Sequence, residues 1–232
     1  MSSEQEHIYN TVKQQIADSV FLNIKNEGLA KSKLSILQGI LKLRQVCCSP
    51  QLLSNSEFES NDAIKIELLV EELKNNLKHN KVLVFSQFKQ MLFLIADELE
   101  KAKIKFYHFD GDTDIKDRMD LIDSFQHDEN DTAVFLMTLK TGNAGINLTA
   151  ADYVFLVDPW WNDAVEQQAI DRTYRIGQTK NVFAYKMICK NSIEEHIIHL
   201  KGKKSFTSTN LIEAEEGFVK SLTLEDIEYL LK

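Results

Sequence analysis

The chain has 232 residues, with 27 lysines and arginines and 35 aspartates and glutamates. Its net charge of −8 argues against non-specific adhesion to nucleic acid as its main property. No apolar run approaches the length of a membrane span, and the polar, acidic start MSSEQEHIYN is unlike a signal peptide, so we expect no membrane association. The three cysteines, adjacent Cys47 and Cys48 and distant Cys189, form no disulfide framework and no zinc spacing, which fits a reducing intracellular compartment and predicts no metal site.

Two long helices are predicted at the start of the chain, over residues 2–24 and 32–48. In the second helix, three leucines at helical spacing predict the buried face: Leu34, Leu37 and Leu41. Arg44 and Gln45, one turn further on, are then expected at the rim of that face. Pro50 ends the helical region, because the residue before a proline is biased away from helix.

A polar loop at 54–62 is the candidate boundary, and the pattern changes after it. Five short apolar runs predict strands: 81–86, 105–109, 132–138, 153–158 and 182–188. Three stretches between them predict helices: 87–102, 114–126 and 163–175. Apolar strands that alternate with helices indicate an α/β fold whose parallel sheet is buried on both faces. Helices over 192–206 and near 223–231, in an acidic tail, complete the chain.

Two short motifs resemble known sites, but the surrounding sequence indicates that each is part of an ordinary helix. Phe93–Glu100 reads as an apolar run that ends in Asp-Glu, like the magnesium-binding strand of ATPases. Apolar residues in this region fall at helical spacing instead, and the chain contains no G-x-x-x-x-G-K-[ST] phosphate loop upstream. His196 and His199 lie three residues apart without a further ligand set nearby, which favours the polar rim of a helix over a metal site.

The residues directly after each strand are candidate site residues, because parallel sheets bind ligands at the carboxyl ends of their strands. These residues include Ser86-Gln87, Asp110-Gly111-Asp112, Thr138-Leu139-Lys140 and Asp158-Pro159-Trp160-Trp161. After Lys140, Gly142 and Gly145 allow close approach of backbone amides to phosphate oxygens. One of the adjacent tryptophans is expected to face solvent or a partner, and exposed tryptophan is a common contact with nucleic acid.

The segment EQQAIDRTYRIGQTK, residues 166–180, carries the strongest signal. In a helix, Gln168, Arg172 and Arg175 share one polar face. Guanidinium groups grip phosphate with a planar, permanently charged fork. The alternative is a solvated charged face with an intrahelical Asp171–Arg175 pair.

The order of these motifs decides between the alternatives. VLVFSQF, FDGDTDIKDR, LMTLKTGNAGINLTAADYVFLVDPWWN and EQQAIDRTYRIGQTKNVFAYKMI together resemble the C-terminal motor lobe of the Swi/Snf family of DNA-translocating ATPases in helicase superfamily two. The resemblance implies a RecA-like three-layer fold with a mostly parallel sheet flanked by helices. It further implies a helical lead-in over 1–60, the motor lobe over 61–190, and a brace helix with an acidic tail over 191–232.

The resemblance also implies residue roles. Arg172 and Arg175 match the arginine fingers of the family. The positions that match its ATP cleft are Gln168, Asp171, Gly145 and Asn147. The positions that match its DNA contacts are Ser86, Gln87, Thr138, Lys140, Gly142 and Trp161.

The expected substrate is ATP with Mg²⁺, whose ligands and phosphate loop would belong to an N-terminal lobe outside this chain. The expected partners are that lobe and double-stranded DNA, and this chain alone is expected to be inactive as an ATPase. The expected location is the nucleoid in a bacterium or the nucleus in a eukaryote.

The rival interpretations are a non-catalytic nucleic-acid or protein interaction module derived from a motor lobe, and the equivalent lobe of an RNA helicase. The two arginines argue against the first, and DPWWN with DRTYRIGQ argues against the second.

Overall fold

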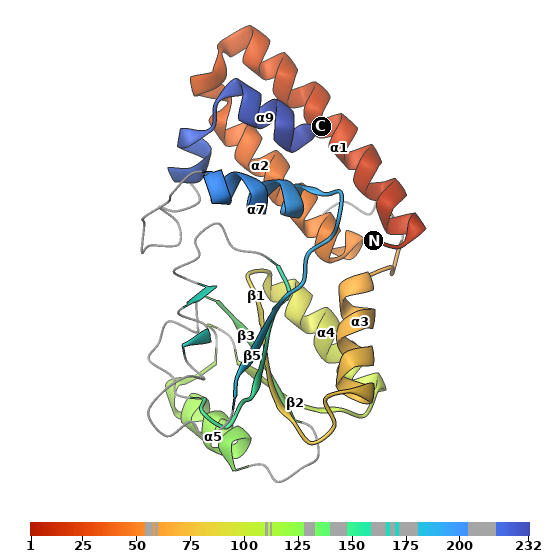
Figure 1. Ribbon diagram of the computed structural model, residues 1–232, viewed down its shortest axis with the longest axis vertical. Coiled ribbons are helices and arrows are strands. Elements are labelled where there is room, and N and C mark those ends of the chain that lie inside the picture. Colours follow the sequence, from red (N-terminus) through yellow and green to blue (C-terminus); the bar gives the residue numbers. More distant parts are fainter. Residues whose placement is uncertain are drawn as a thin grey trace. The chain divides into compact units, whose positions relative to one another are not determined.

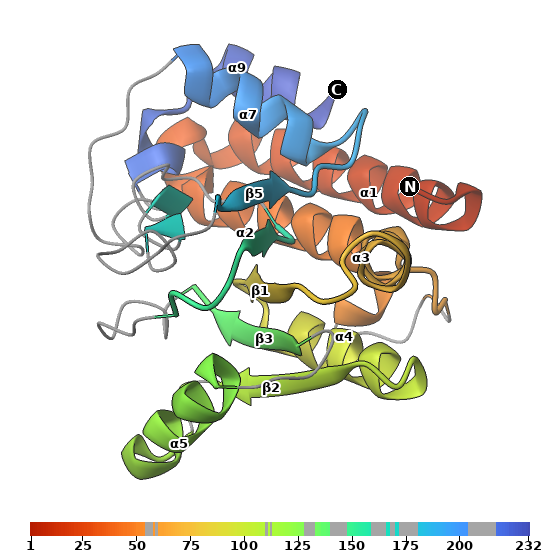
Figure 2. The same ribbon diagram turned by 60° about the horizontal axis from the view of Figure 1, so that its bottom comes forward.

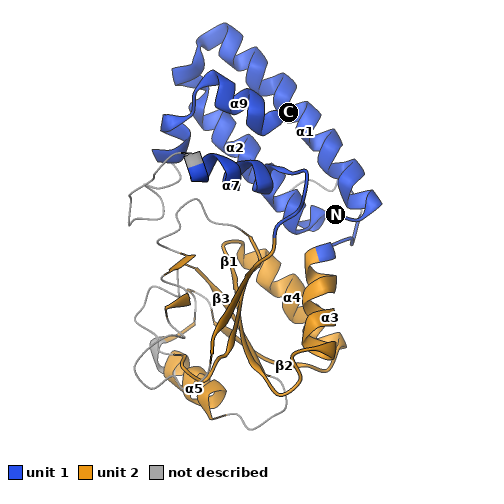
Figure 3. Ribbon diagram, in the orientation of Figure 1, with its two compact units in different colours: residues 1–64, 188–232 blue, residues 65–187 orange. Residues whose placement is uncertain are grey.

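The computed structural model describes residues 1–53, 58, 60–109, 111, 113–127, 133–139, 148–158, 166–167, 170–171, 181–203 and 217–232. The chain divides into two compact units (Figure 3). Unit 1 joins the two ends of the sequence, residues 1–64 and 188–232, and unit 2 is formed by residues 65–187. The division into lead-in, motor lobe and brace stays a prediction about function, but its first and last segments fold together.

A five-stranded, all-parallel sheet forms the centre of unit 2, in the order β2-β3-β1-β4-β5 (Figure 2). The strands are β1 (Lys81–Ser86), β2 (Lys105–Phe109), β3 (Ala133–Thr138), β4 (Tyr153–Leu156) and β5 (Phe183–Lys186). In β1 and β3, at the middle of the sheet, five of the six residues are buried. The predicted parallel α/β sheet is therefore confirmed.

Helices flank this sheet on both sides: α3 (Ile64–Asn75), α4 (Lys89–Lys101) and α5 (Ile115–Gln126). Figure 1 shows α3 and α4 on one side and α5 on the other. This follows from the strand order, because right-handed connections from β1 out to β2 and back to β3 place their helices on opposite faces. The apolar residues of α4, Met91, Leu92, Ile95 and Leu99, are fully buried, which confirms an amphipathic helix in place of a magnesium-binding strand.

The edge strand β5 differs from the prediction of strands buried on both faces. All four of its residues are exposed. Across the last two strands the aromatic rings stack on one another, with centroid distances of 5.3 Å for Tyr153–Phe183 and 5.2 Å for Phe155–Tyr185. The rings thus shield each other at the edge of the sheet formed by the described strands, which explains an apolar sequence at an exposed position.

Unit 1 is helical, with α1 (Ser3–Glu27), α2 (Leu29–Cys48), the short η1 (Pro50–Leu52), α7 (Ile193–Lys203) and α9 (Leu224–Leu231) (Figure 1). Gly28 makes the turn between α1 and α2 with a φ of 82°, a left-handed conformation that favours glycine. The predicted helices at both ends of the chain are confirmed in type and place.

The buried face of α2 was predicted wrongly. Leu34 is 66% exposed and Leu41 is 38% exposed, whereas Ile36, Ile40 and Leu43 are buried, and Arg44 is fully buried instead of lying at the rim. Two apolar stripes run along this helix about 100° apart, so helical spacing fits both of them. Its packing against α1 and α7 selects the stripe that faces the core.

Candidate functional site

A buried polar cluster lies where β1 and β4 end, at the carboxyl edge of the sheet. Ser86 is the last residue of β1, and its hydroxyl donates to Oδ2 of Asp158 at 2.5 Å. Asp158 also accepts from the backbone N–H of Gln87 at 3.2 Å, and both Ser86 and Asp158 are at most 1% exposed. The carboxylate thus fixes the turn that leads from β1 toward α4.

Ser86 also joins the ends of three neighbouring strands. Its carbonyl accepts from Leu139 N–H at 3.4 Å, after β3, and it lies opposite Thr138 in the parallel register. On the other side, Val157 N–H donates to the carbonyl of Phe85 at 2.9 Å, after β4. The Ser86 hydroxyl accepts in turn from Phe88 N–H at 3.0 Å. The structure therefore brings Ser86, Gln87 and Thr138 together at one edge.

A buried lysine supports the same edge from α3. Lys65 is 3% exposed, and its Nζ donates to the carbonyl of Val157 at 2.7 Å, next to Asp158 in the chain. A buried carboxylate costs much free energy unless it receives hydrogen bonds and lies near positive charge. Ser86, Gln87 and the nearby lysine supply both.

Asp171 lies in the predicted arginine helix, of which the structure describes only a few residues. Its carboxylate is exposed and accepts from Nε2 of Gln167 at 2.8 Å, and its N–H donates to the Gln167 carbonyl at 2.8 Å. Buried Glu166, just before it, pairs with Nζ of Lys186 at 2.5 Å. This ion pair ties Glu166 to β5.

The other predicted site residues lie outside the described residues: Arg172, Arg175, Gln168, Gly145, Asn147, Lys140, Gly142 and Trp161. Sequence reasoning named Asp158 as a strand-end residue without giving it a role, and it missed Lys65. For Asp158 the signal was its position directly after a strand. For Lys65 there was none, because its partner Val157 is 92 residues away in the chain.

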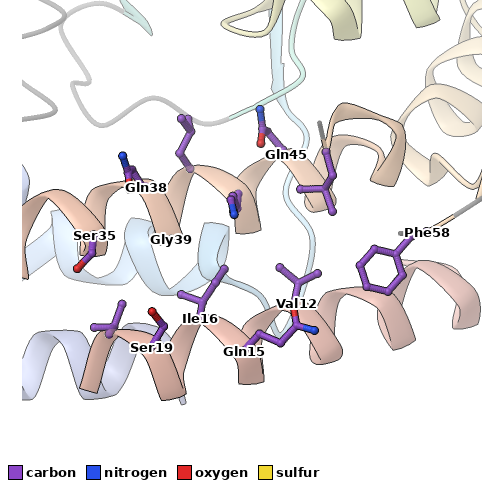
Figure 4. A pocket seen from close by; sticks show the side chains of 13 residues that line it. Val12, Gln15, Ile16, Ser19, Ser35, Gln38, Gly39, Gln45 and Phe58 are labelled. Carbon is purple, nitrogen blue, oxygen red and sulfur yellow. The ribbon is translucent and has the colours of Figure 1, made fainter. Parts of the chain in front are cut away.

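A groove in unit 1, of about 580 Å³, lies between α1 and α2 (Figure 4). Apolar side chains and neutral amides dominate its lining, among them Val12, Ile16, Gln38 and Gln45. Of the predicted ATP and DNA residues that the structure describes, Ser86, Gln87, Thr138 and Asp171, none lines this groove.

Comparison with known proteins decides the family. The family described as "Helicase conserved C-terminal domain" matches residues 64–177. An uncharacterized ATP-dependent helicase of Mycoplasma genitalium is 37% identical over 203 residues, and the ATP-dependent helicase rhp16 of Schizosaccharomyces pombe is 43% identical over 169 residues. The Sulfolobus solfataricus SWI2/SNF2 ATPase core in complex with dsDNA is 30% identical, with a TM-score of 0.75 over 99% of this chain.

This chain belongs to the Swi/Snf family and contains its helicase C-terminal domain. Its sheet and flanking helices are the RecA-like fold that the resemblance implied. The aligned region covers 87% of this chain in the Mycoplasma match and 72% in the rhp16 match. This chain spans only 19% and 20% of the length of those two relatives, and 48% of the Sulfolobus core. Among the described residues, no helix is both long and apolar enough to cross a membrane.

Proposed function

We propose that this lobe is the DNA-gripping and arginine-finger half of an ATP-dependent translocase on double-stranded DNA. The observation that carries the proposal is the buried cluster of Ser86, Asp158 and Lys65 at the carboxyl edge of the sheet, where a parallel α/β fold binds its ligands. The SWI2/SNF2 relative in complex with dsDNA supports double-stranded DNA as the partner.

Gln87 is the residue that this cluster would present to DNA. The Ser86 hydroxyl is fully buried and bonded to Asp158, so Ser86 would position the turn instead of touching a phosphate. Lys140, Gly142, Thr138 and Trp161 would complete the backbone contacts. Such contacts position the duplex without reading its sequence.

Arg172 and Arg175 would stabilise the negative charge that develops on the transferring phosphoryl group of ATP. Two guanidinium groups and the Gln168 amide are hydrogen-bond donors, and this donor set fits phosphate oxygens. The carboxylate of Asp171 would repel phosphate, so we expect it to orient one of the two arginines by an ion pair instead of binding ATP itself. Gly145 and Asn147 would line the same cleft.

Magnesium would be held by the N-terminal lobe. The carboxylate of Asp158 already accepts hydrogen bonds from Ser86 and Gln87, so it does not suit a metal ion. Mg²⁺ would neutralise charge on the ATP phosphates. The lead-in over 1–60 and the brace over 191–232 would link and support the two lobes.

The test is Arg175→Ala in the longer protein that joins this lobe to its N-terminal lobe. ATP turnover at saturating ATP and DNA is expected to fall by about 10³–10⁵, because an arginine finger acts on the transition state. Arg175→Lys should not restore turnover fully, since an ammonium lacks the bidentate fork. The melting temperature and DNA affinity should stay nearly unchanged.

Lys101→Ala is the matched control, because its side chain is 70% exposed and pairs only locally with Glu98. It should leave turnover unchanged, and the isolated 232-residue chain should hydrolyse no ATP. Near-normal turnover of Arg175→Ala would refute the arginine-finger role and favour a non-catalytic interaction module.

A further inference from the structure

We propose that Cys47, Cys189 and Glu194 in unit 1 form a binding site for a thiophilic divalent cation, with zinc as the ion that fits best. The two Sγ atoms and a carboxylate oxygen of Glu194 lie within 4.8 Å of one another. All three side chains are buried, at 0%, 4% and 0% exposure. This site is independent of the proposed motor function.

Local hydrogen bonds hold two of the ligands beside the third. Cys47 lies in the last turn of α2, and the Cys189 thiol donates to its carbonyl at 3.4 Å. Glu194, in the first turn of α7, accepts from Cys189 N–H at 2.8 Å, and the Ser192 hydroxyl donates to the Cys189 carbonyl at 2.7 Å. The segment before α7 and the first turn of that helix are thus folded so that the Cys189 thiol and the Glu194 carboxylate both lie near Cys47 at the end of α2.

The spacing of the three ligand atoms is close to what zinc requires. Tetrahedral zinc has bonds of about 2.3 Å to sulfur and about 2.0–2.2 Å to oxygen, which places ligand atoms roughly 3.5–3.8 Å apart. Because the three ligand atoms already lie within 4.8 Å of one another, a small inward movement of the side chains would bring them to the distances that zinc requires. Thiolate ligands favour zinc over magnesium or calcium, which prefer oxygen.

An unsatisfied buried acceptor beside the cluster is a second, independent observation. Gln5 is fully buried, and its Nε2 donates to the carbonyls of Val46 at 2.8 Å and Cys47 at 3.2 Å. Its Oε1 has no hydrogen-bond partner within the described part of the chain. Gln5 and the Cys189 thiol share the Cys47 carbonyl, so the amide lies next to the cluster. A water molecule as the fourth zinc ligand would donate to this oxygen.

Tyr9 and Arg44 provide suitable surroundings for the charge of such a site. Tyr9 is 2% exposed, and its hydroxyl accepts from Ile193 N–H at 2.7 Å. The Tyr9 hydroxyl is thus a buried hydrogen-bonding group beside the start of α7. Arg44, also fully buried, lies one turn before Cys47 on α2.

Binding of zinc at this site would release protons from the two thiols. Two neutral thiols and one carboxylate bind Zn²⁺ and release two protons, which leaves a complex with a net charge of −1. Metal affinity should therefore fall as pH falls, because protons compete for the thiolates. Since the ligands come from α2 and from the start of α7, the ion would cross-link the two ends of the chain within unit 1.

The test is a cobalt titration of the reduced, chelator-treated full chain. We expect one equivalent of Co²⁺ to give visible bands of tetrahedral cobalt and a near-ultraviolet thiolate-to-cobalt band, both removed by Zn²⁺. Cys47→Ser and Cys189→Ser should abolish the thiolate band, and Glu194→Gln should weaken metal affinity at least about tenfold. The matched control is Cys48→Ser, because Cys48 is a buried neighbour outside the cluster.

A second measurement keeps the test decisive if a ligand variant fails to fold. In the unaltered chain, stoichiometric Zn²⁺ should raise the melting temperature and protect two of the three cysteines from alkylation during partial unfolding. The proposal is overturned if no thiolate band develops, or if the band survives loss of both Cys47 and Cys189. It is equally overturned if the two cysteines prove to be a redox pair that forms a disulfide but binds no metal when reduced.

Discussion

Two buried aspartates at opposite ends of β4 show how single residues set the geometry of the sheet. At the carboxyl end, Asp158 binds the Ser86 hydroxyl and Gln87 N–H. At the amino end, Asp152 accepts from Lys81 N–H at 3.0 Å and from the Asn80 amide at 2.8 Å. Each carboxylate therefore ties β4 to one end of β1, but only one lies at the proposed DNA-facing edge.

Asp158→Asn is expected to lower the free energy of unfolding by about 1–3 kcal/mol. An asparagine amide has a single accepting oxygen, and its NH₂ group would face a hydrogen-bond donor. Asp152→Asn should cost a similar amount for the same reason, since Asp152 is only 6% exposed. In the two-lobe protein, DNA affinity and DNA-stimulated turnover should fall for Asp158→Asn alone. Equal loss of DNA affinity in both variants would show that the effect is general destabilisation.

At the scale of elements, close approach of two helices depends on one glycine. Gly39 of α2 faces Ile16 of α1 (Figure 4), and a Cβ added at Gly39 would lie 2.5 Å from Cγ2 of Ile16. Isoleucine is branched at Cβ, so its methyl group cannot easily swing away. The contact explains how a glycine is tolerated inside a 20-residue helix, despite its poor helix propensity.

Gly39→Ala should therefore destabilise the chain by about 1 kcal/mol, as overpacking outweighs the gain of about 1 kcal/mol in helix propensity. In an Ile16→Ala background the same substitution should become stabilising, because the clashing methyl group is gone. Chemical denaturation of the four proteins of this cycle measures the coupling. If Gly39→Ala has the same sign in both backgrounds, the close contact does not limit the packing of α1 on α2.

At the scale of the whole molecule, charge is distributed unevenly. The chain carries a net charge of −8, yet residues 30–56 contain four cations and no acid: Lys31, Lys33, Lys42 and Arg44. One of them, Arg44, is buried and cannot meet a partner at the surface. We therefore expect this lobe to make only a few local phosphate contacts with DNA, against a repulsive overall field.

The isolated chain should bind duplex DNA weakly and without sequence preference. For about two phosphate contacts, affinity should fall roughly tenfold between about 50 and 200 mM salt, through counterion release. Fluorescence anisotropy with two unrelated duplexes at both salt concentrations measures this. A strong preference for one duplex, or an affinity indifferent to salt, would argue against backbone-directed binding.

The sequence by itself determined the strands and most of the helices. The bounds of β1 and β2 agree with the predicted runs, because a short stretch rich in β-branched or aromatic residues is a local property of the chain. The parallel sheet followed from the alternation of strands and helices. The helix α3 was missed, although buried Ile66, Leu69 and Leu73 lie at helical spacing within it.

Tertiary structure decided what depends on partners distant in the chain. The choice between the two apolar stripes of α2 and the burial of Arg44 required α1 and α7. At the candidate site, the sequence indicated Ser86, Gln87 and Thr138 as strand-end residues, but only the fold showed that Asp158 and Lys65 hold that edge. The cluster of Cys47 with Cys189 joins residues 142 positions apart, so no local spacing could reveal it. Periodicity is read from neighbours in sequence, whereas burial and coordination are set by neighbours in space.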